Sequence, residues 1–123
     1  MSKRAIVHIE IPAQSRPGSA EFYQKVFGWE FQHMTEPGPY SMSETENKVG
    51  IGLPDLDDGL YKPGDVIVYL DSDDIAADLK QIEAAGGKRL GDPVTVGTMG
   101  EMAFFVDPSG NRLALWKTFP MSE

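Results

Sequence analysis

The sequence predicts one α+β domain built from two copies of a strand–helix–strand–strand–strand unit. Segments rich in β-branched residues and two helical patterns follow one another in the same order in each half of the chain. A shift of 59 residues aligns the halves, and the aligned pairs include Ala20 with Leu79, Tyr23 with Ile82 and Gly28 with Gly87. Similarity at a fixed spacing indicates an internal repeat. An ordinary α+β sandwich with one sheet is the alternative.

The first repeat is expected over about residues 1–55. Its first strand covers residues 4–12, where His8 and Glu10 share one face, and proline ends it. A helix follows over residues 17–27, and Gly28 stops it. Further strands are expected over residues 29–34, 40–43 and 49–53. The last contains two glycines, which indicate a bend or a close approach.

A linker over residues 56–64 separates the repeats, because proline, glycine and aspartate dominate this segment. The second repeat is expected over residues 65–119. It begins with a strand over residues 65–71 and a helix that Ser72 or Asp73 caps. Three more strands are expected over residues 88–96, 99–106 and 112–117, and the first of them has a break at 91–93. A turn over residues 107–110 joins the last two strands.

Composition excludes several classes of protein. The chain has 123 residues, of which 41% are hydrophobic, so a buried core is expected. It has no cysteine, which excludes disulfides and zinc–thiolate sites. The net charge of −8 comes without a basic patch, so no nucleic-acid partner is expected. No segment reads as a signal peptide or a membrane span, which predicts a cytoplasmic protein without a membrane partner.

Three segments carry a resemblance to a known family. They are His8-Ile-Glu-Ile-Pro12, Glu21-Phe-Tyr-Gln-Lys-Val-Phe-Gly-Trp29 and Phe105-Val-Asp-Pro-Ser-Gly-Asn-Arg-Leu-Ala-Leu-Trp116. In this order and spacing they resemble the vicinal oxygen chelate superfamily of glyoxalases, extradiol dioxygenases and bleomycin-resistance proteins. The resemblance implies two βαβββ units forming a cupped mixed sheet around a cavity, often in a homodimer. In metal-dependent members, the cavity holds one divalent ion as a Lewis acid.

The resemblance also implies four metal-ligand positions, and this chain fills only one of them with a ligand. The four positions hold His8, Gly52, Ile67 and Ala114. Glycine, isoleucine and alanine side chains cannot coordinate a cation. Glu10 could assist His8, but the two residues do not complete a shell. We therefore expect no metal cofactor, with a divalent metal as the alternative.

Strand alternation gives a candidate ligand-binding face made of His8, Glu10, Ile67, Tyr69, Ala114 and Trp116. Apolar side chains with a few polar anchors are typical of small-molecule sites. Tyr69 and Trp116 could equally be core residues.

Three functions follow from these observations. The first is a metal-free protein that binds a small organic ligand. The second is a divalent-metal-dependent lyase of the glyoxalase, or lactoylglutathione lyase, type. The third is metal-free catalysis with His8 and Glu10 as a proton-transfer pair. Fold alone does not choose among them.

Overall fold

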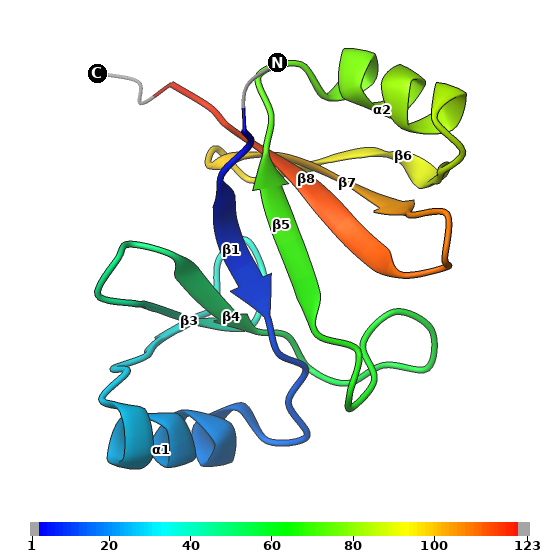
Figure 1. The fold of residues 1–123 in the computed structure, drawn as a ribbon. Helices are drawn as coiled ribbons and strands as arrows, with labels where there is room; N and C mark the ends of the chain where they lie inside the picture. Colours follow the sequence, from blue (N-terminus) through cyan, green and yellow to red (C-terminus); the bar gives the residue numbers. More distant parts are fainter. Residues whose placement is uncertain (1–2, 121–123) are drawn as a thin grey trace. The chain divides into compact units, whose positions relative to one another are not determined.

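The computed structural model describes residues 3–120 and contains two compact units, which Figure 1 shows in ribbon form. The N-terminal unit covers residues 7–67. The C-terminal unit covers residues 68–120 together with residues 3–6. Each unit is described separately below.

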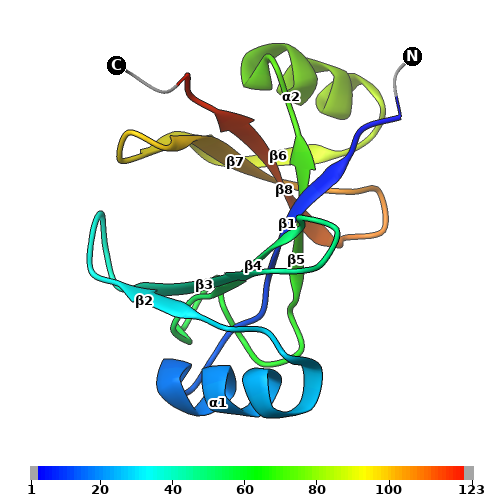
Figure 2. The same cartoon turned by 90° about the vertical axis from the view of Figure 1, so that its left-hand side faces the viewer.

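The N-terminal unit folds as strand, helix and three strands. Its elements are β1 (Ile6–Glu10), α1 (Arg16–Phe27), β2 (Gln32–Met34), β3 (Tyr40–Glu44) and β4 (Gly50–Leu53). The strand order is β2-β3-β4-β1, with β1 parallel to β4 and the other pairs antiparallel. Figure 2 shows α1 against one face of these strands.

The C-terminal unit repeats this topology. Its elements are β5 (Ile67–Asp71), α2 (Ile75–Ala84), β6 (Lys88–Val96), β7 (Gly100–Val106) and β8 (Arg112–Thr118). The order is β6-β7-β8-β5, and β5 runs parallel to β8. The predicted doubling of one βαβββ unit is therefore confirmed. So is the break in the long strand, where the β6–β7 register shifts between Leu90 and Val94.

Local sequence explains where the helices begin and end. Ser15 caps α1 by accepting a hydrogen bond from the Gly18 amide, and Gly28 closes the helix in the left-handed conformation at φ 77°. The predicted cap of α2, Ser72 or Asp73, was wrong by one or two residues. The cap is Asp74, whose side chain accepts a hydrogen bond from the Ala77 amide. The strand predicted over residues 29–34 is shorter in the structure, where β2 covers only the last three of these residues.

Each helix covers a small core on one face of its own sheet. In the C-terminal unit the buried cluster comprises Ile75, Leu79, Ala103, Phe105 and Leu115. In the N-terminal unit it comprises Ala13, Ala20 and Leu53. Because side chains alternate along a strand, neighbouring residues point to the opposite face of each sheet, away from the helix. We call these the helix-free faces.

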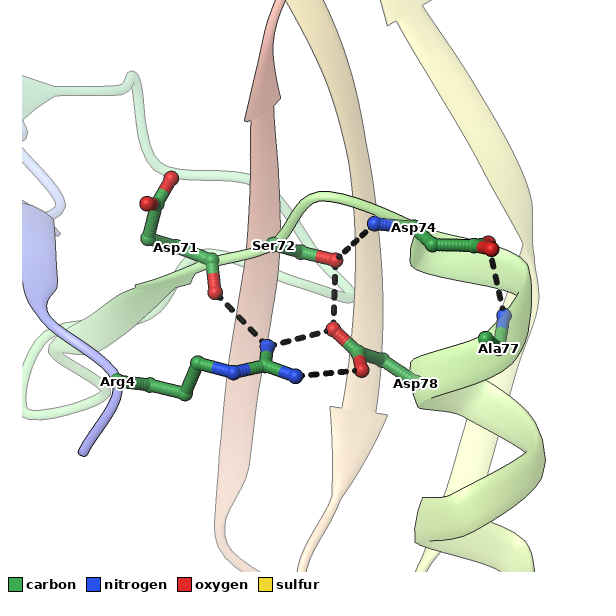
Figure 3. A network of polar contacts seen from close by, with 6 residues as sticks. All are labelled: Arg4, Asp71, Ser72, Asp74, Ala77 and Asp78. Carbon is green, nitrogen blue, oxygen red and sulfur yellow. Dashed lines mark hydrogen bonds and ion pairs between the residues drawn. The ribbon is translucent and has the colours of Figure 1, made fainter. Parts of the chain in front are cut away.

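An ion pair ties residue 4 to α2 within the C-terminal unit (Figure 3). Arg4 donates two hydrogen bonds to Asp78, at 2.7 and 2.9 Å, and a third to the Asp71 carbonyl at 3.1 Å. The buried Ser72 hydroxyl also donates to Asp78, at 2.6 Å. The hydrogen bond from Arg4 is the main cause that lowers the pKa of Asp78. The carboxylate is therefore the stable form in the folded unit.

We expect Asp78→Asn to lower the free energy of unfolding by about 1–2 kcal/mol at neutral pH, because charge-assisted bonds to a partly exposed arginine are lost. The lowered pKa means that the contribution of Asp78 disappears as the pH falls through the folded-state pKa, which lies below 3.8. Urea titrations at pH 7 and pH 3 measure both effects. Asp73→Asn removes the same charge from an exposed neighbouring position and serves as the control.

Candidate functional site

Two glycines of β4 create room on the helix-free face of the N-terminal unit. A Cβ atom at Gly50 would overlap Nδ1 of His8, and one at Gly52 would overlap the Tyr40 hydroxyl and lie 2.7 Å from His8 Nε2. Real Cβ atoms do not approach other atoms this closely. The predicted close approach at this strand is therefore confirmed, and the approaching groups are an imidazole and a phenol.

His8 and Glu10 share this face, as predicted, and Tyr40 connects them. The Tyr40 hydroxyl donates to Oε2 of Glu10 at 2.7 Å and contacts Nε2 of His8 at 2.8 Å. Tyr61 donates to the other carboxylate oxygen of Glu10, Oε1, at 3.0 Å. The result is a continuous polar network of four side chains, which we call the Tyr40 network.

Tyr61 reaches Glu10 from the segment that the sequence predicts as a linker. Oδ1 of Asp57 accepts from the backbone amides of Gly59, Leu60 and Tyr61, at 3.0, 2.6 and 2.9 Å. This carboxylate organises the turn that carries Tyr61 to the sheet. The segment therefore contributes a side chain to the site in addition to joining the repeats.

Burial sets the electrostatics of the Tyr40 network. Burial lowers the pKa of His8 from 6.5 to about 4, so the ring is neutral at pH 7. Burial first, and then the charge and hydrogen bond of Glu10, raise the pKa of Tyr40 far above its ordinary value. Glu10 itself is only 4% exposed. These groups form a fixed, hydrogen-bonded polar patch, because buried polar groups are stable only when they are paired.

The helix-free face of the C-terminal unit is apolar and aromatic. Tyr69 is paired with Ala114 in the sheet, and both are buried. The Tyr69 ring packs edge-on against Phe104 with centroids 6.3 Å apart, and its hydroxyl lies 3.8 Å from the Met102 sulfur. Trp116, on the same face, is half-buried.

Glycine also makes room for Trp116. A Cβ at Gly100 would lie 2.6 Å from the indole ring, so only glycine fits beneath it. The indole N–H donates to the Thr118 hydroxyl at 2.9 Å. The aromatic residues therefore have satisfied polar atoms and present their rings on this face.

The four metal-ligand positions that the resemblance implies lack donors apart from His8. The side-chain space above Gly52 holds the Tyr40 hydroxyl, and Ile67 and Ala114 are buried with 1% and 0% of their surface exposed. Within residues 3–120, no group of three or more histidine, cysteine, aspartate or glutamate side chains could hold a metal ion. The residues present do not fit a divalent-ion shell.

A second polar cluster occupies the other face of the N-terminal sheet. His33 Nδ1 lies 2.6 Å from the Ser41 hydroxyl, and Arg16 donates to the same hydroxyl at 3.3 Å. Ser41 is fully buried. A nucleophile must reach its substrate, so this serine–histidine pair has a structural role between sheet and helix.

The sequence predicted that His8 and Glu10 share a face, but it did not indicate their contacts with Tyr40 and Tyr61. The alternation of side chains along β3 could have indicated Tyr40. Met42 pairs with Gly52, and Tyr40 lies two residues from Met42 on the same face of the sheet. No local pattern indicates Tyr61, since its position depends on the folding of an irregular segment.

Comparison with known proteins gives a consistent result. The family model of the glyoxalase/bleomycin resistance protein/dioxygenase superfamily matches residues 5–115. A glyoxylase-like domain-containing protein of Didymella fabae is 32% identical over 115 residues, which cover 87% of this chain and 88% of that protein. The anthracycline biosynthesis protein DnrV of Streptomyces peucetius is 32% identical over 114 residues, which cover 80% of this chain but 42% of that protein. The chain thus spans less than half the length of this curated relative.

Solved structures share the fold. A hypothetical protein from Bacillus halodurans superposes with a TM-score of 0.79 at 15% identity, over 99% of both chains. A methylmalonyl-CoA epimerase of Streptomyces coelicolor superposes with a TM-score of 0.67 at 22% identity, over 95% of this chain and 99% of that one. The match of the family model to residues 5–115 and the 32% identity with the Didymella fabae protein show that the chain belongs to the glyoxalase/bleomycin resistance protein/dioxygenase superfamily.

Proposed function

We propose that this chain binds a small, partly aromatic organic molecule through side chains on its helix-free sheet faces. His8 and Glu10 supply the polar anchors on the N-terminal unit. On the helix-free face of the C-terminal unit, the half-buried Trp116 is a separate candidate contact, whereas the other predicted residues, Ile67, Tyr69 and Ala114, are buried. The observation that carries the proposal is the Tyr40 network. It places hydrogen-bonding groups at fixed positions on a sheet face, as ligand sites do.

We further propose that binding does not use the metal of other superfamily members. The Tyr40 hydroxyl lies where a side chain at residue 52 would project, and it contacts the one nitrogen of His8 nearest that space. A metal ion at His8 Nε2 would have to displace this phenol. Among the residues described, too few carboxylates or imidazoles gather nearby to compensate for the lost hydrogen bonds.

The alternative is a divalent-metal-dependent lyase of the glyoxalase type. The family membership and the glyoxylase-like relative favour it. The two proposals differ in what stabilises the folded protein, because any ligand of the native state raises the unfolding temperature.

A thermal-shift screen separates the two proposals. The probes are Ni²⁺, Zn²⁺ and Mn²⁺, S-hexylglutathione, and the anthracycline doxorubicin, which the relation to DnrV suggests. We expect an organic probe to raise the melting temperature, with about 2.7 kcal/mol of stabilisation at 100 times its Kd. We expect no rise with the metals alone. Tyr40→Phe is expected to weaken the organic effect, and Tyr23→Phe, on α1, is the matched control.

A metal-dependent rise in melting temperature, together with metal binding tighter than about micromolar in calorimetry, would favour the lyase instead.

We also propose that the chain is a cytoplasmic homodimer without nucleic-acid or membrane partners. The family resemblance supports the dimer, and the net charge of −8 opposes binding to nucleic acid. Among residues 3–120, no helix has the length and apolar character to cross a bilayer. Gel filtration with light scattering is expected to give twice the chain mass of 13.5 kDa, and a monomeric mass would contradict the proposal.

A further inference from the structure

The outer side of α1 carries several large apolar side chains that are exposed. Phe22, Val26 and Phe27 are 55%, 56% and 60% exposed, although they belong to the helix that buries Ala20 against its sheet. Figures 1 and 2 show no other helix or strand of the described N-terminal unit on this side of α1. Single exposed apolar residues need no explanation, whereas a contiguous patch indicates a surface that another molecule covers.

Ring contacts make these side chains one continuous surface. The Phe22 ring packs edge-on against Tyr23, with centroids 5.1 Å apart, and against Phe27, at 6.4 Å. Phe27 lies 6.0 Å from Trp29, and Trp29 stacks on Tyr23 at 5.5 Å. Val26 follows Phe22 by one helical turn on the same side. We call Phe22, Val26 and Phe27 the α1 patch.

The charges beside the α1 patch complement a second copy of the same surface. Glu21 and Lys25 are exposed, lie one turn apart and flank Phe22 and Val26. Neither charge takes part in the ion pairs within residues 3–120. In a two-fold symmetric, antiparallel pair of α1 helices, Glu21 of each copy faces Lys25 of the other, which gives two ion pairs beside the apolar contact.

The free edge of β6, in the C-terminal unit, is the competing surface for a second copy. This strand ends the sheet, and Leu90 and Val94 on it are 40% and 55% exposed. The β6–β7 register shifts between these two residues, and Pro93 has no amide hydrogen to donate. Such interruptions protect an edge strand from pairing with another chain. The α1 patch has no comparable interruption.

We propose that the α1 patch is the contact surface between two copies of this chain, packed as an antiparallel pair of α1 helices with reciprocal Glu21–Lys25 ion pairs. The proposal deepens the proposed homodimer and rests on it. A stable interface buries about 800 Å² on each side, whereas a half-exposed phenylalanine adds only about 100 Å². We therefore expect a dimer that dissociates at concentrations of about 1–100 µM.

Sedimentation equilibrium over about 1–500 µM measures the dimer dissociation constant. Val26→Gln and Val94→Gln make the same replacement at valines that are 56% and 55% exposed, one on α1 and one on β6. Because Val26 enters the interface twice, we expect Val26→Gln to raise the dissociation constant about tenfold or more. Val94→Gln should leave it within about twofold of the wild type. Glutamine favours a helix more than valine does, so α1 is retained in Val26→Gln.

Charge reversal tests the antiparallel geometry. Glu21→Lys gives α1 two neighbouring bases and Lys25→Glu gives it two neighbouring acids, so each variant alone meets like charges across the two-fold axis. We expect each variant to dimerise about tenfold more weakly than the wild type. An equimolar mixture of the two variants should regain the wild-type affinity as a heterodimer, because both ion pairs form again.

An unchanged dissociation constant in Val26→Gln, or a mixture that regains no affinity, would overturn the α1 interface and leave the homodimer standing. A loss of affinity in Val94→Gln alone would assign the contact to the β6 edge instead. A wild-type protein that stays monomeric at about 500 µM would refute the homodimer and this interface together. None of these replacements changes a member of the Tyr40 network, so the thermal-shift screen tests the binding function independently.

Discussion

Gly52→Ala is expected to lower the free energy of unfolding by about 3 kcal/mol and to break the Tyr40 network. The added methyl group would overlap the Tyr40 hydroxyl and lie 2.7 Å from His8 Nε2. Either the phenol leaves Glu10, or the strands shift apart. Urea unfolding at pH 7 measures the loss, and the tyrosine absorbance spectrum reports movement of the phenol.

Gly38→Ala is the matched control, because a Cβ at that glycine would have no neighbour within 4 Å. Its stability should stay within about 0.5 kcal/mol of the wild type. In a Tyr40→Ala background, Gly52→Ala should cost much less, which gives a coupling energy of about 1–3 kcal/mol. Equal losses for Gly52→Ala and Gly38→Ala would show that Tyr40 does not occupy this space.

Acid is expected to destabilise the protein through His8. The folded-state pKa of His8 is about 4 and its ordinary value is 6.5, so the unfolded chain binds the proton more tightly. The contribution of His8 to the free energy of unfolding is therefore complete above pH 6.5. It is lost as the pH drops from 6.5 to 4 and does not change further below pH 4. The difference between these two pKa values, 6.5 and about 4, corresponds to a full loss of about 3 kcal/mol.

His8→Gln isolates this effect, because glutamine does not titrate. We expect the wild type to lose about 2–3 kcal/mol more than His8→Gln between pH 7 and pH 4.5, in urea titrations at each pH. His33→Gln makes the same replacement at the other histidine, which is exposed, and is the matched control. Parallel pH profiles for the wild type and His8→Gln would show that His8 is protonated as easily in the folded protein as in the unfolded chain.

The elements of the fold were predictable because they depend on local patterns. Serine and glycine mark the ends of α1, and alternation places His8 and Glu10 on one face of β1. The repeat was visible because each unit buries one helix on one sheet with the same spacing. The cap of α2 was misplaced because three consecutive polar residues, Ser72, Asp73 and Asp74, can all cap a helix.

The partners of the site residues were not predictable in the same way. Tyr40 lies 30 residues from Glu10, and Tyr61 lies 51 residues from it. Contacts at such separations depend on strand pairing and on the turn that Asp57 holds, and periodicity contains no signal for either.

Residue patterns alone were enough to predict the doubled βαβββ topology and the shared face of His8 and Glu10. Residue identity alone shows that the side chains at Gly52, Ile67 and Ala114 cannot coordinate a cation. What occupies the side-chain space above Gly52 is visible only in the folded N-terminal unit. Strand pairing brings Tyr40 over Gly52, and its hydroxyl joins His8 to Glu10. Side-chain identity limits which atoms can coordinate a metal ion or donate a hydrogen bond, whereas the pairing of distant strands decides which of those atoms meet.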